Sequence, residues 1–130
     1  MLLIDTDIAS YAIKSQHGMA SKLLNLNPDN WAISAITHHE ISYGISLDGV
    51  SSRIKIAGLA FLQASKVLSF DNAASQEAAM VRKQLRMLGK PSGHYDSLIA
   101  GHAIAIGATL VTNNTRHFEN VPGLKLENWL

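Results

Sequence analysis

The chain has 130 residues, of which 47% are hydrophobic and 16% charged, and 11 basic and 10 acidic side chains give a formal net charge of +1. This composition excludes a disordered chain, which combines low apolar content with high net charge, and the length predicts one domain over residues 1–130. The absence of cysteine excludes a disulfide scaffold and thiolate chemistry.

Short apolar runs alternate with longer helical patterns along the chain. Strands are expected at residues 2–4, 31–34, 67–70 and 109–112, and a fifth at 123–126. Helices are expected at residues 8–13, 19–26, 36–47, 51–64, 72–88 and 95–106. This alternation predicts an α/β domain with a mostly parallel sheet of four to five strands flanked by helices. No segment has the pattern of a signal peptide or a membrane span, so we expect a cytoplasmic protein with no membrane contact.

Three acidic residues stand where an α/β sheet brings strand and helix ends together. Asp5 follows the first strand, Glu40 lies in the helix after the second strand, and Asp96 opens an apolar helix. Ligands bind at the carboxyl ends of parallel strands, so these carboxylates can converge on one cleft. Clustered carboxylates repel one another unless a cation neutralises them. Oxygen ligands without thiols indicate Mg²⁺ or Mn²⁺ rather than Zn²⁺.

Each of these acids also has a structural interpretation. Asp5 can cap the next helix, Asp96 can favour the helix dipole from the first turn, and Glu40 can be a solvated helix residue. Asp71 is interpreted as an N-cap. His102 lies on an apolar helix and is interpreted as a packed core histidine, and with no His-Glu-x-x-His pair in the sequence a zinc site is not expected.

Taken together, several segments resemble the PIN-domain family, and within it the VapC-type toxin ribonucleases of toxin–antitoxin modules. The resemblance rests on residues 3–7, 36–44, 93–103, 110–118, 121–124 and 127–129. It covers the whole chain in order. It implies a PIN-like three-layer sandwich and a metal-dependent endoribonuclease. Such an enzyme hydrolyses RNA phosphodiester bonds, in transfer RNA or ribosomal RNA, with a metal-activated water.

The resemblance also implies roles for particular residues. Asp5, Glu40 and Asp96 would be catalytic and would hold Mg²⁺, for which Mn²⁺ can substitute. Asn114 is a candidate further ligand, because a fourth acid is common near this position in the family. Related sequences can also carry Glu at His117. The residues expected to support the metal site without binding the ion themselves are Thr6, Asp7, Thr112 and Asn113.

Basic residues are candidates for contacts with RNA phosphates. Arg116 lies close to the asparagine pair. Arg82, Arg86 and Lys90 recur every four residues, so they are expected to share one helix face, which either binds phosphates or is simply solvated. The resemblance further implies a homodimer, a cognate small antitoxin that covers the acidic groove, and a larger toxin–antitoxin assembly.

Two other functions are compatible with the same residues. A buried strand followed by Asp5-Thr6-Asp7 also fits a phosphatase of the haloacid-dehalogenase type, with Asp5 as nucleophile. The missing fourth acid also fits a non-catalytic PIN module that binds RNA or a partner. Tyr43 and Tyr95 stand beside the acidic positions, where each can stack on a base or pack in the core.

Overall fold

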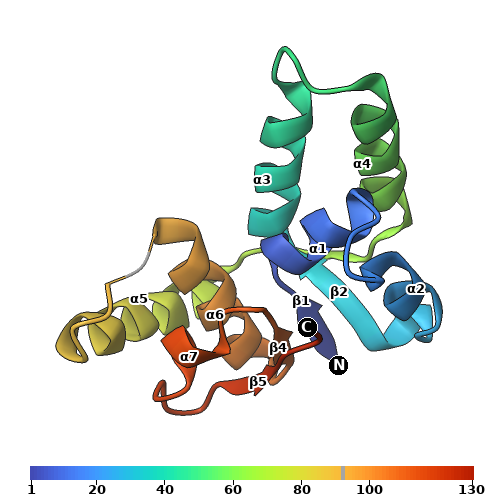
Figure 1. Cartoon of the computed structure of the whole chain (residues 1–130). Coiled ribbons are helices and arrows are strands. Elements are labelled where there is room, and N and C mark those ends of the chain that lie inside the picture. Colours follow the sequence, from blue (N-terminus) through green and yellow to red (C-terminus); the bar gives the residue numbers. More distant parts are fainter. Residues whose placement is uncertain (92) are drawn as a thin grey trace.

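The computed structural model describes residues 1–91 and 93–130. Five strands form a parallel sheet in the order β3–β2–β1–β4–β5, as Figure 1 shows. The strands are β1 (Leu2–Ile4), β2 (Trp31–Ser34), β3 (Val67–Leu68), β4 (Thr109–Val111) and β5 (Lys125–Glu127). The expected α/β class is therefore confirmed, and every strand pair of the sheet is parallel.

Helices connect the strands. They are α1 (Thr6–Ile13), α2 (Met19–Leu24), α3 (Ala35–Ser46), α4 (Ser52–Ala64), α5 (Asn72–Met87), α6 (His94–Ile106) and α7 (Thr115–Phe118), with a 3₁₀ turn at Pro28–Asn30. Most lie within two residues of the expected ranges. No helix among the described residues is long and apolar enough to cross a bilayer.

The two faces of the sheet are covered by different helices, which gives three layers. Successive strand residues point to opposite faces, so Leu3 packs with α5 and α6 while Ile4 packs with α1 and α2. On β2, Ala32 packs on the same face as Leu3, and Ile33 packs on the same face as Ile4. Burial on both faces explains why the central strand β1 is apolar throughout, whereas the edge strand β5 alternates as Lys125-Leu126-Glu127.

Helices α5 and α6 pack unusually closely. A Cβ added to Gly101 would lie 2.2 Å from the backbone nitrogen of Ala78, so only glycine fits at this crossing. Ala78 is itself buried. The contact fixes the position of α6, whose first turn carries Asp96.

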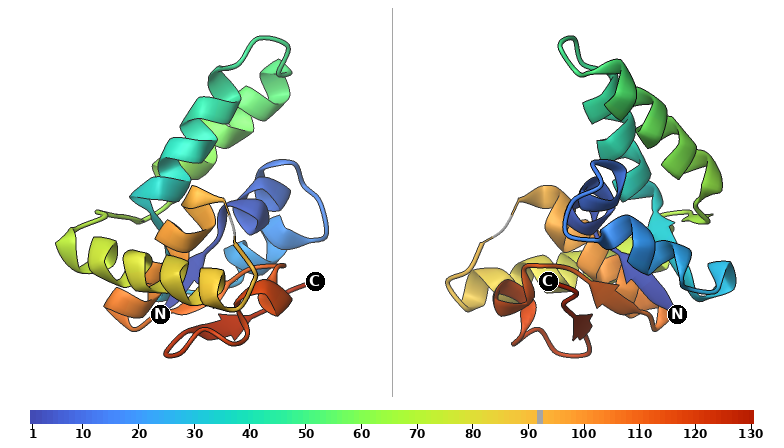
Figure 2. Two further views of the ribbon diagram at one scale, coloured as in Figure 1. Left: turned by 90° about the vertical axis from the view of Figure 1, so that its left-hand side faces the viewer. Right: turned by 45° about the vertical axis from the view of Figure 1, so that its right-hand side comes forward.

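Helices α3 and α4 form a hairpin that projects from the rest of the molecule, as Figure 2 shows. Its base is held by Ser34, whose hydroxyl accepts a hydrogen bond from the N–H of Ile36 as the N-cap of α3. The Ser34 oxygen also lies 2.8 Å from Nδ1 of His102 on α6. His102 is 1% exposed, which confirms it as a core histidine and ties α3 to α6.

Three features differ from the sequence-based expectation. Strand β3 ends at Leu68 rather than at residue 70, and the Phe70 ring instead packs perpendicular to the His102 ring with 5.5 Å between their centroids. Strand β5 begins at Lys125, since Gly123 lies in a turn with a φ of 79°. Helix α7 was not predicted, since four residues are too few for a periodic pattern.

Candidate active site

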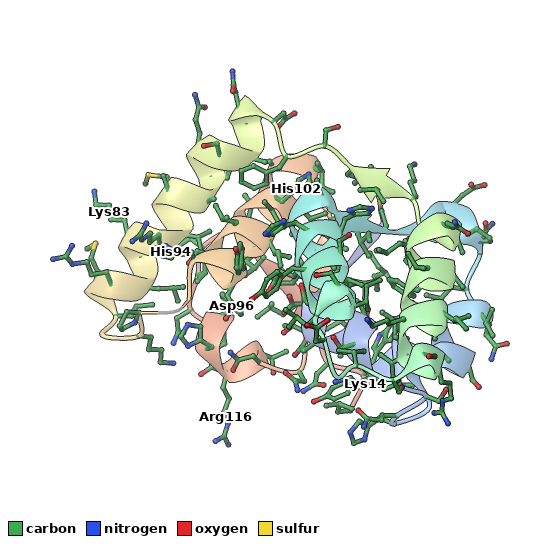
Figure 3. All side chains as sticks on the ribbon, turned by 90° about the horizontal axis from the view of Figure 1, so that it is seen from above. Lys14, Lys83, His94, Asp96, His102 and Arg116 are labelled. Atoms are coloured by element: carbon green, nitrogen blue, oxygen red, sulfur yellow. The ribbon has the colours of Figure 1, made fainter. Side chains whose placement is uncertain are left out.

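Acidic and amide side chains meet in a cavity of about 360 Å³ at the carboxyl edge of the sheet. Figure 3 looks down on this side of the molecule and labels Asp96 at the start of α6. The cavity is lined by Asp5, Thr6, Asp7, Glu40, Asp96, Asn113 and Asn114. The three acids predicted to converge therefore do so, although they are separated by up to 91 positions in the chain.

Asp5 links the sheet to the cavity. Its backbone N–H donates to the carbonyl of Val111 at 2.9 Å, and its carboxylate accepts from the N–H of Thr6 at 2.8 Å, which confirms that it caps α1. Burial, followed by the negative charge of Asp7, raises the pKa of the Asp5 carboxyl to about 7, although hydrogen bonds from the Thr112 hydroxyl and the Thr6 N–H act in the opposite direction. A nearby cation would favour the charged carboxylate and so act against this shift.

Glu40 is held by a chain of hydroxyls. The Thr6 hydroxyl donates to Glu40 Oε1 at 2.7 Å, and its oxygen lies 3.1 Å from that of Thr37. Because a hydroxyl has one proton, Thr37 is left to donate to Thr6. Burial, and then the charge of Asp96, raises the pKa of Glu40 despite the Thr6 hydrogen bond. Glu40 is therefore half-buried and hydrogen bonded, which differs from the alternative of a freely solvated helix residue. The sequence reasoning missed Thr37, although this residue stands one helical turn before Glu40.

Asp7 joins helix α1 to the loop after β4. Its Oδ1 accepts from the N–H of Ile8 at 2.8 Å, and its Oδ2 accepts a long hydrogen bond from the N–H of Asn113 at 3.4 Å. The Asn113 amide in turn donates to the hydroxyl of Tyr11 at 3.0 Å. Burial raises the pKa of Asp7, and the charge of Asp96 raises it further, although the hydrogen bonds from the N–H groups of Ile8 and Asn113 lower it. Both side chains are thus tied to neighbouring elements.

Asp96 is the third residue of α6, which confirms its position as a first-turn acid. Burial raises the pKa of its carboxyl, and His117 acts in the opposite direction. The Nε2 of His117 is buried and has no hydrogen-bond partner among the described residues. The sequence reasoning did not assign His117 to the site. Its place just after the asparagine pair, in the segment that returns to the cavity, was the available signal.

The remaining polar candidates occupy the β4 side of the cavity. Thr112 is fully buried, and its oxygen accepts from the N–H of Asn114 at 3.1 Å. Its hydroxyl also hydrogen bonds to Asp5. Asn114 is exposed and lines the cavity. Thr112 thus lies beneath the cavity as a support for Asp5, and Asn114 is open to a ligand.

The predicted RNA-contacting basic residues lie outside the cavity lining. Arg82 and Arg86 are exposed on α5, and Figure 3 shows Arg116 extending outward from α7. Lys90 does not share their helix face, because α5 ends at Met87 and the chain turns at Gly89 with a φ of 70°. Its ammonium donates instead to the carbonyl of Arg116 at 3.1 Å. The prediction of one continuous basic helix face is therefore wrong for Lys90.

The cavity presents oxygen donors of the kind that hard divalent cations bind. Over residues 1–91 and 93–130, no three His, Asp or Glu side chains approach closely enough to form a complete ligand set on their own. Mg²⁺ keeps several waters and is usually held by one or two carboxylates, so it does not require such a cage. The donor chemistry and the raised carboxylate pKa values fit a hydrated divalent cation.

The sequence model of the PIN-domain family matches residues 2–124. The match includes strands β1 to β4 and every residue that lines the cavity, and it ends just before β5. The chain therefore belongs to the PIN-domain family. The alternative of a haloacid-dehalogenase phosphatase is set aside by this finding.

Comparison with individual relatives identifies a group of PIN-domain proteins to which this chain is similar. The chain is 36% identical over 127 residues to the tRNA(fMet)-specific endonuclease VapC of Shigella flexneri, covering 98% of this chain and 96% of the relative. It is 36% identical over 129 residues to ribonuclease VapC2 of Rickettsia felis, with the same coverage. The crystal structure of DNA-bound VapBC from Salmonella typhimurium contains a chain that is 34% identical and superimposes with a TM-score of 0.87 over 99% of this chain and 98% of that one. The homologues are thus VapC ribonucleases.

Proposed function

We propose that this protein is the toxin of a toxin–antitoxin pair, an Mg²⁺-dependent endoribonuclease that cleaves RNA phosphodiester bonds. The observation that carries the proposal is the convergence of Asp5, Asp7, Glu40 and Asp96 on one cavity, where each carboxyl has a raised pKa. A polyanionic substrate would be repelled from four bare carboxylates. The cavity is suited to RNA only together with a cation, which Asp5, Glu40 and Asp96 would hold, with Asn114 as a further candidate.

A bound divalent ion would activate water and stabilise the charge that develops on the phosphate. The protein's own groups prepare the site for that chemistry. The Thr6 hydroxyl fixes one oxygen of Glu40, and the Thr112 hydroxyl with the Thr6 N–H fixes Asp5. The charge of His117 favours the ionised form of Asp96, and the Nε2 atom of His117 is buried without a hydrogen-bond partner among the described residues. Arg116, Arg82, Arg86 and Lys90 would attract the RNA backbone from outside the cavity.

Transfer RNA is the first candidate substrate. Two curated relatives, from Shigella flexneri and Salmonella typhimurium, are named tRNA(fMet)-specific endonucleases, at 36% and 35% identity. Ribosomal RNA is the second candidate.

An antitoxin and a homodimer belong to the same proposal. Solved structures of relatives are VapBC complexes, and those from Rickettsia felis and Salmonella typhimurium are bound to DNA. A groove of about 200 Å³ between α1, α3 and α4 adjoins the acidic cavity and shares Thr6 and Glu40 with it. Its other walls include Ile13, Ile41 and Ile54, so an apolar antitoxin segment bound there would also block the acids.

A cleavage assay tests the proposal. Purified protein would be incubated with total transfer RNA and with ribosomal RNA, in Mg²⁺ or Mn²⁺ and then in excess chelator. Discrete fragments that disappear with chelator and with Asp96→Asn are expected. Asp71→Asn is the matched control, because Asp71 caps α5 outside the cavity and asparagine caps equally well. Binding of RNA by both the parent and Asp96→Asn without any cleavage would instead favour the non-catalytic module.

A further inference from the structure

A second cavity lies next to the acidic one and is lined by aromatic and imidazole rings. It has a volume of about 460 Å³, and its walls are His39, Glu40, Tyr43 and Tyr95. Glu40 also lines the acidic cavity, so the two spaces share a wall. Any ligand that fills the second cavity therefore lies beside the carboxylates.

Helices α3 and α6 each supply both kinds of group. On α3, Tyr43 follows Glu40 by three residues and so shares its helix face. On α6, Tyr95 immediately precedes Asp96. The two walls are thus carried by the same helices that carry the acids, and the buried contact between Ser34 and His102 links these helices.

The rings are exposed instead of contributing to the core. Tyr43 is 62% exposed and Tyr95 is 43% exposed. The rings of His39 and Tyr95 lie 5.8 Å apart, and the Tyr95 hydroxyl is 3.4 Å from His39 Nε2, which is a long contact for a hydrogen bond. The polar tips of both side chains are therefore available to a ligand. The core interpretation of the two tyrosines is wrong.

We propose that this aromatic cavity binds one unpaired nucleobase of the RNA, next to the phosphate that is cleaved. The inference rests on the proposed nuclease function and specifies what the same site recognises. Proteins that read single-stranded RNA stack bases on aromatic side chains and hydrogen bond to their edges. Tyr43 and Tyr95 supply the faces for stacking, and His39 with the Tyr95 hydroxyl supplies groups for an edge.

The aromatic cavity shares a wall with the acidic cavity, and this continuity is the reason to infer that RNA occupies it. A base and its phosphate are joined by a single sugar, so a strand whose phosphate lies at the carboxylates places the adjoining base within reach of the shared wall at Glu40. The position also makes a structural demand on the substrate. A paired base inside a helix cannot enter, so cleavage is restricted to loops and other unpaired segments.

Steady-state cleavage of an unstructured ten-nucleotide RNA tests the inference. Tyr43→Ala and Tyr95→Ala are each expected to raise KM about 5- to 100-fold, the range for loss of one stacked base. Tyr43→Phe and Tyr95→Phe keep the ring and are expected to stay within about 3-fold of the parent. Leu24→Ala is the control, because Leu24 is 84% exposed on α2 and lines neither cavity. Annealing the RNA to its complement is expected to abolish cleavage.

A second measurement does not depend on turnover. The same RNA carrying 5-iodouridine would be irradiated with the Asp96→Asn protein, and the cross-linked peptide identified by mass spectrometry. Cross-links to Tyr43, Tyr95 or His39 are expected.

The outcomes separate the two proposals. If the parent cleaves no RNA, the nuclease proposal fails and this inference fails with it. If the parent cleaves RNA but both alanine variants keep its KM, only the base-binding inference is overturned. It is also overturned if those variants leave RNA kinetics intact and lose binding to a protein partner or to a second copy of the chain.

Discussion

Two regions of this protein bury ionisable side chains, and they differ in how well those side chains are partnered. His102 is enclosed between Ser34 and the Phe70 ring, with no like charge described beside it. Asp5 is almost as buried, but Asp7 and Asp96 add negative charge around it. The histidine contact joins two helices and serves the fold. The acidic cavity carries repulsion that an added cation or a retained proton would relieve, which indicates that it is the functional site of the molecule.

Replacing one carboxyl in the cavity is expected to have the largest effect. Asp5→Asn keeps the shape and a capping oxygen but removes a proposed metal ligand. RNA cleavage is expected to fall at least about 100-fold, since changes to groups that merely support a metal ligand already cost 10- to 100-fold. The rate would be measured against Asp71→Asn. Cleavage within 3-fold of the parent would remove Asp5 from the proposed machinery.

The same substitution is expected to stabilise the metal-free protein. The unfolded chain loses the Asp5 proton near pH 3.8, and the folded chain keeps it to about pH 7. Over that interval the folded state holds more protons, so the free energy of unfolding falls as pH rises. The contribution is about 4 kcal/mol by pH 8, because the two pKa values differ by about 3 and each pKa unit corresponds to about 1.4 kcal/mol.

Urea unfolding from pH 4 to 8 in chelator would measure this effect, with Asp5→Asn expected to flatten the profile. Adding Mg²⁺ at pH 8 is expected to stabilise the parent more than the variant. Identical profiles for the two proteins would show that folding does not raise the pKa of Asp5.

Replacing His102 is expected to destabilise the protein, in contrast to the stabilisation expected from Asp5→Asn. His102→Leu removes a buried polar partner of Ser34 and is expected to lower the free energy of unfolding by about 1–3 kcal/mol. Burial lowers the pKa of His102, so in the parent its contribution is present at neutral pH and is lost as pH falls below the ordinary value of 6.5. Urea unfolding at pH 5 and pH 7.5 checks both the size of the change in the free energy of unfolding and the direction of its pH dependence. A variant as stable as the parent at both pH values would contradict it.

The smallest effect is expected from Thr6→Val. The change keeps the shape of the side chain and removes the hydroxyl that donates to Glu40. Cleavage is expected to fall about 10-fold, because Glu40 loses its fixed orientation while remaining in place. Thr6→Ser restores the hydroxyl and is expected to recover the rate. Equal rates for the valine and serine variants would exclude a positioning role for this hydroxyl.

The strands and the positions of polar residues at their ends could be predicted from the sequence. Contacts between residues that are distant in the chain could not. The apolar runs that end at Asp5 and before Asn113 predicted the strands and the edge at which their polar residues meet. The segment containing Glu40 matched a family pattern that already placed it near Asp5. By contrast, the local sequence offers only a position as a signal for Thr37 and His117, one helical turn before Glu40 and just after the asparagine pair. Their partners lie 31 and 21 positions away, so only the tertiary packing selects them.

The order of strands in the sheet has a consequence for how the chain is made. Strand β1 is synthesised first but is completed on one side by β4, which begins more than 100 residues later. Asp5 hydrogen bonds to Val111 and Thr112, so its surroundings do not exist until that late segment has left the ribosome. A nascent or prematurely terminated chain therefore lacks the assembled cavity. The proposed ribonuclease would therefore have no assembled site throughout most of its synthesis.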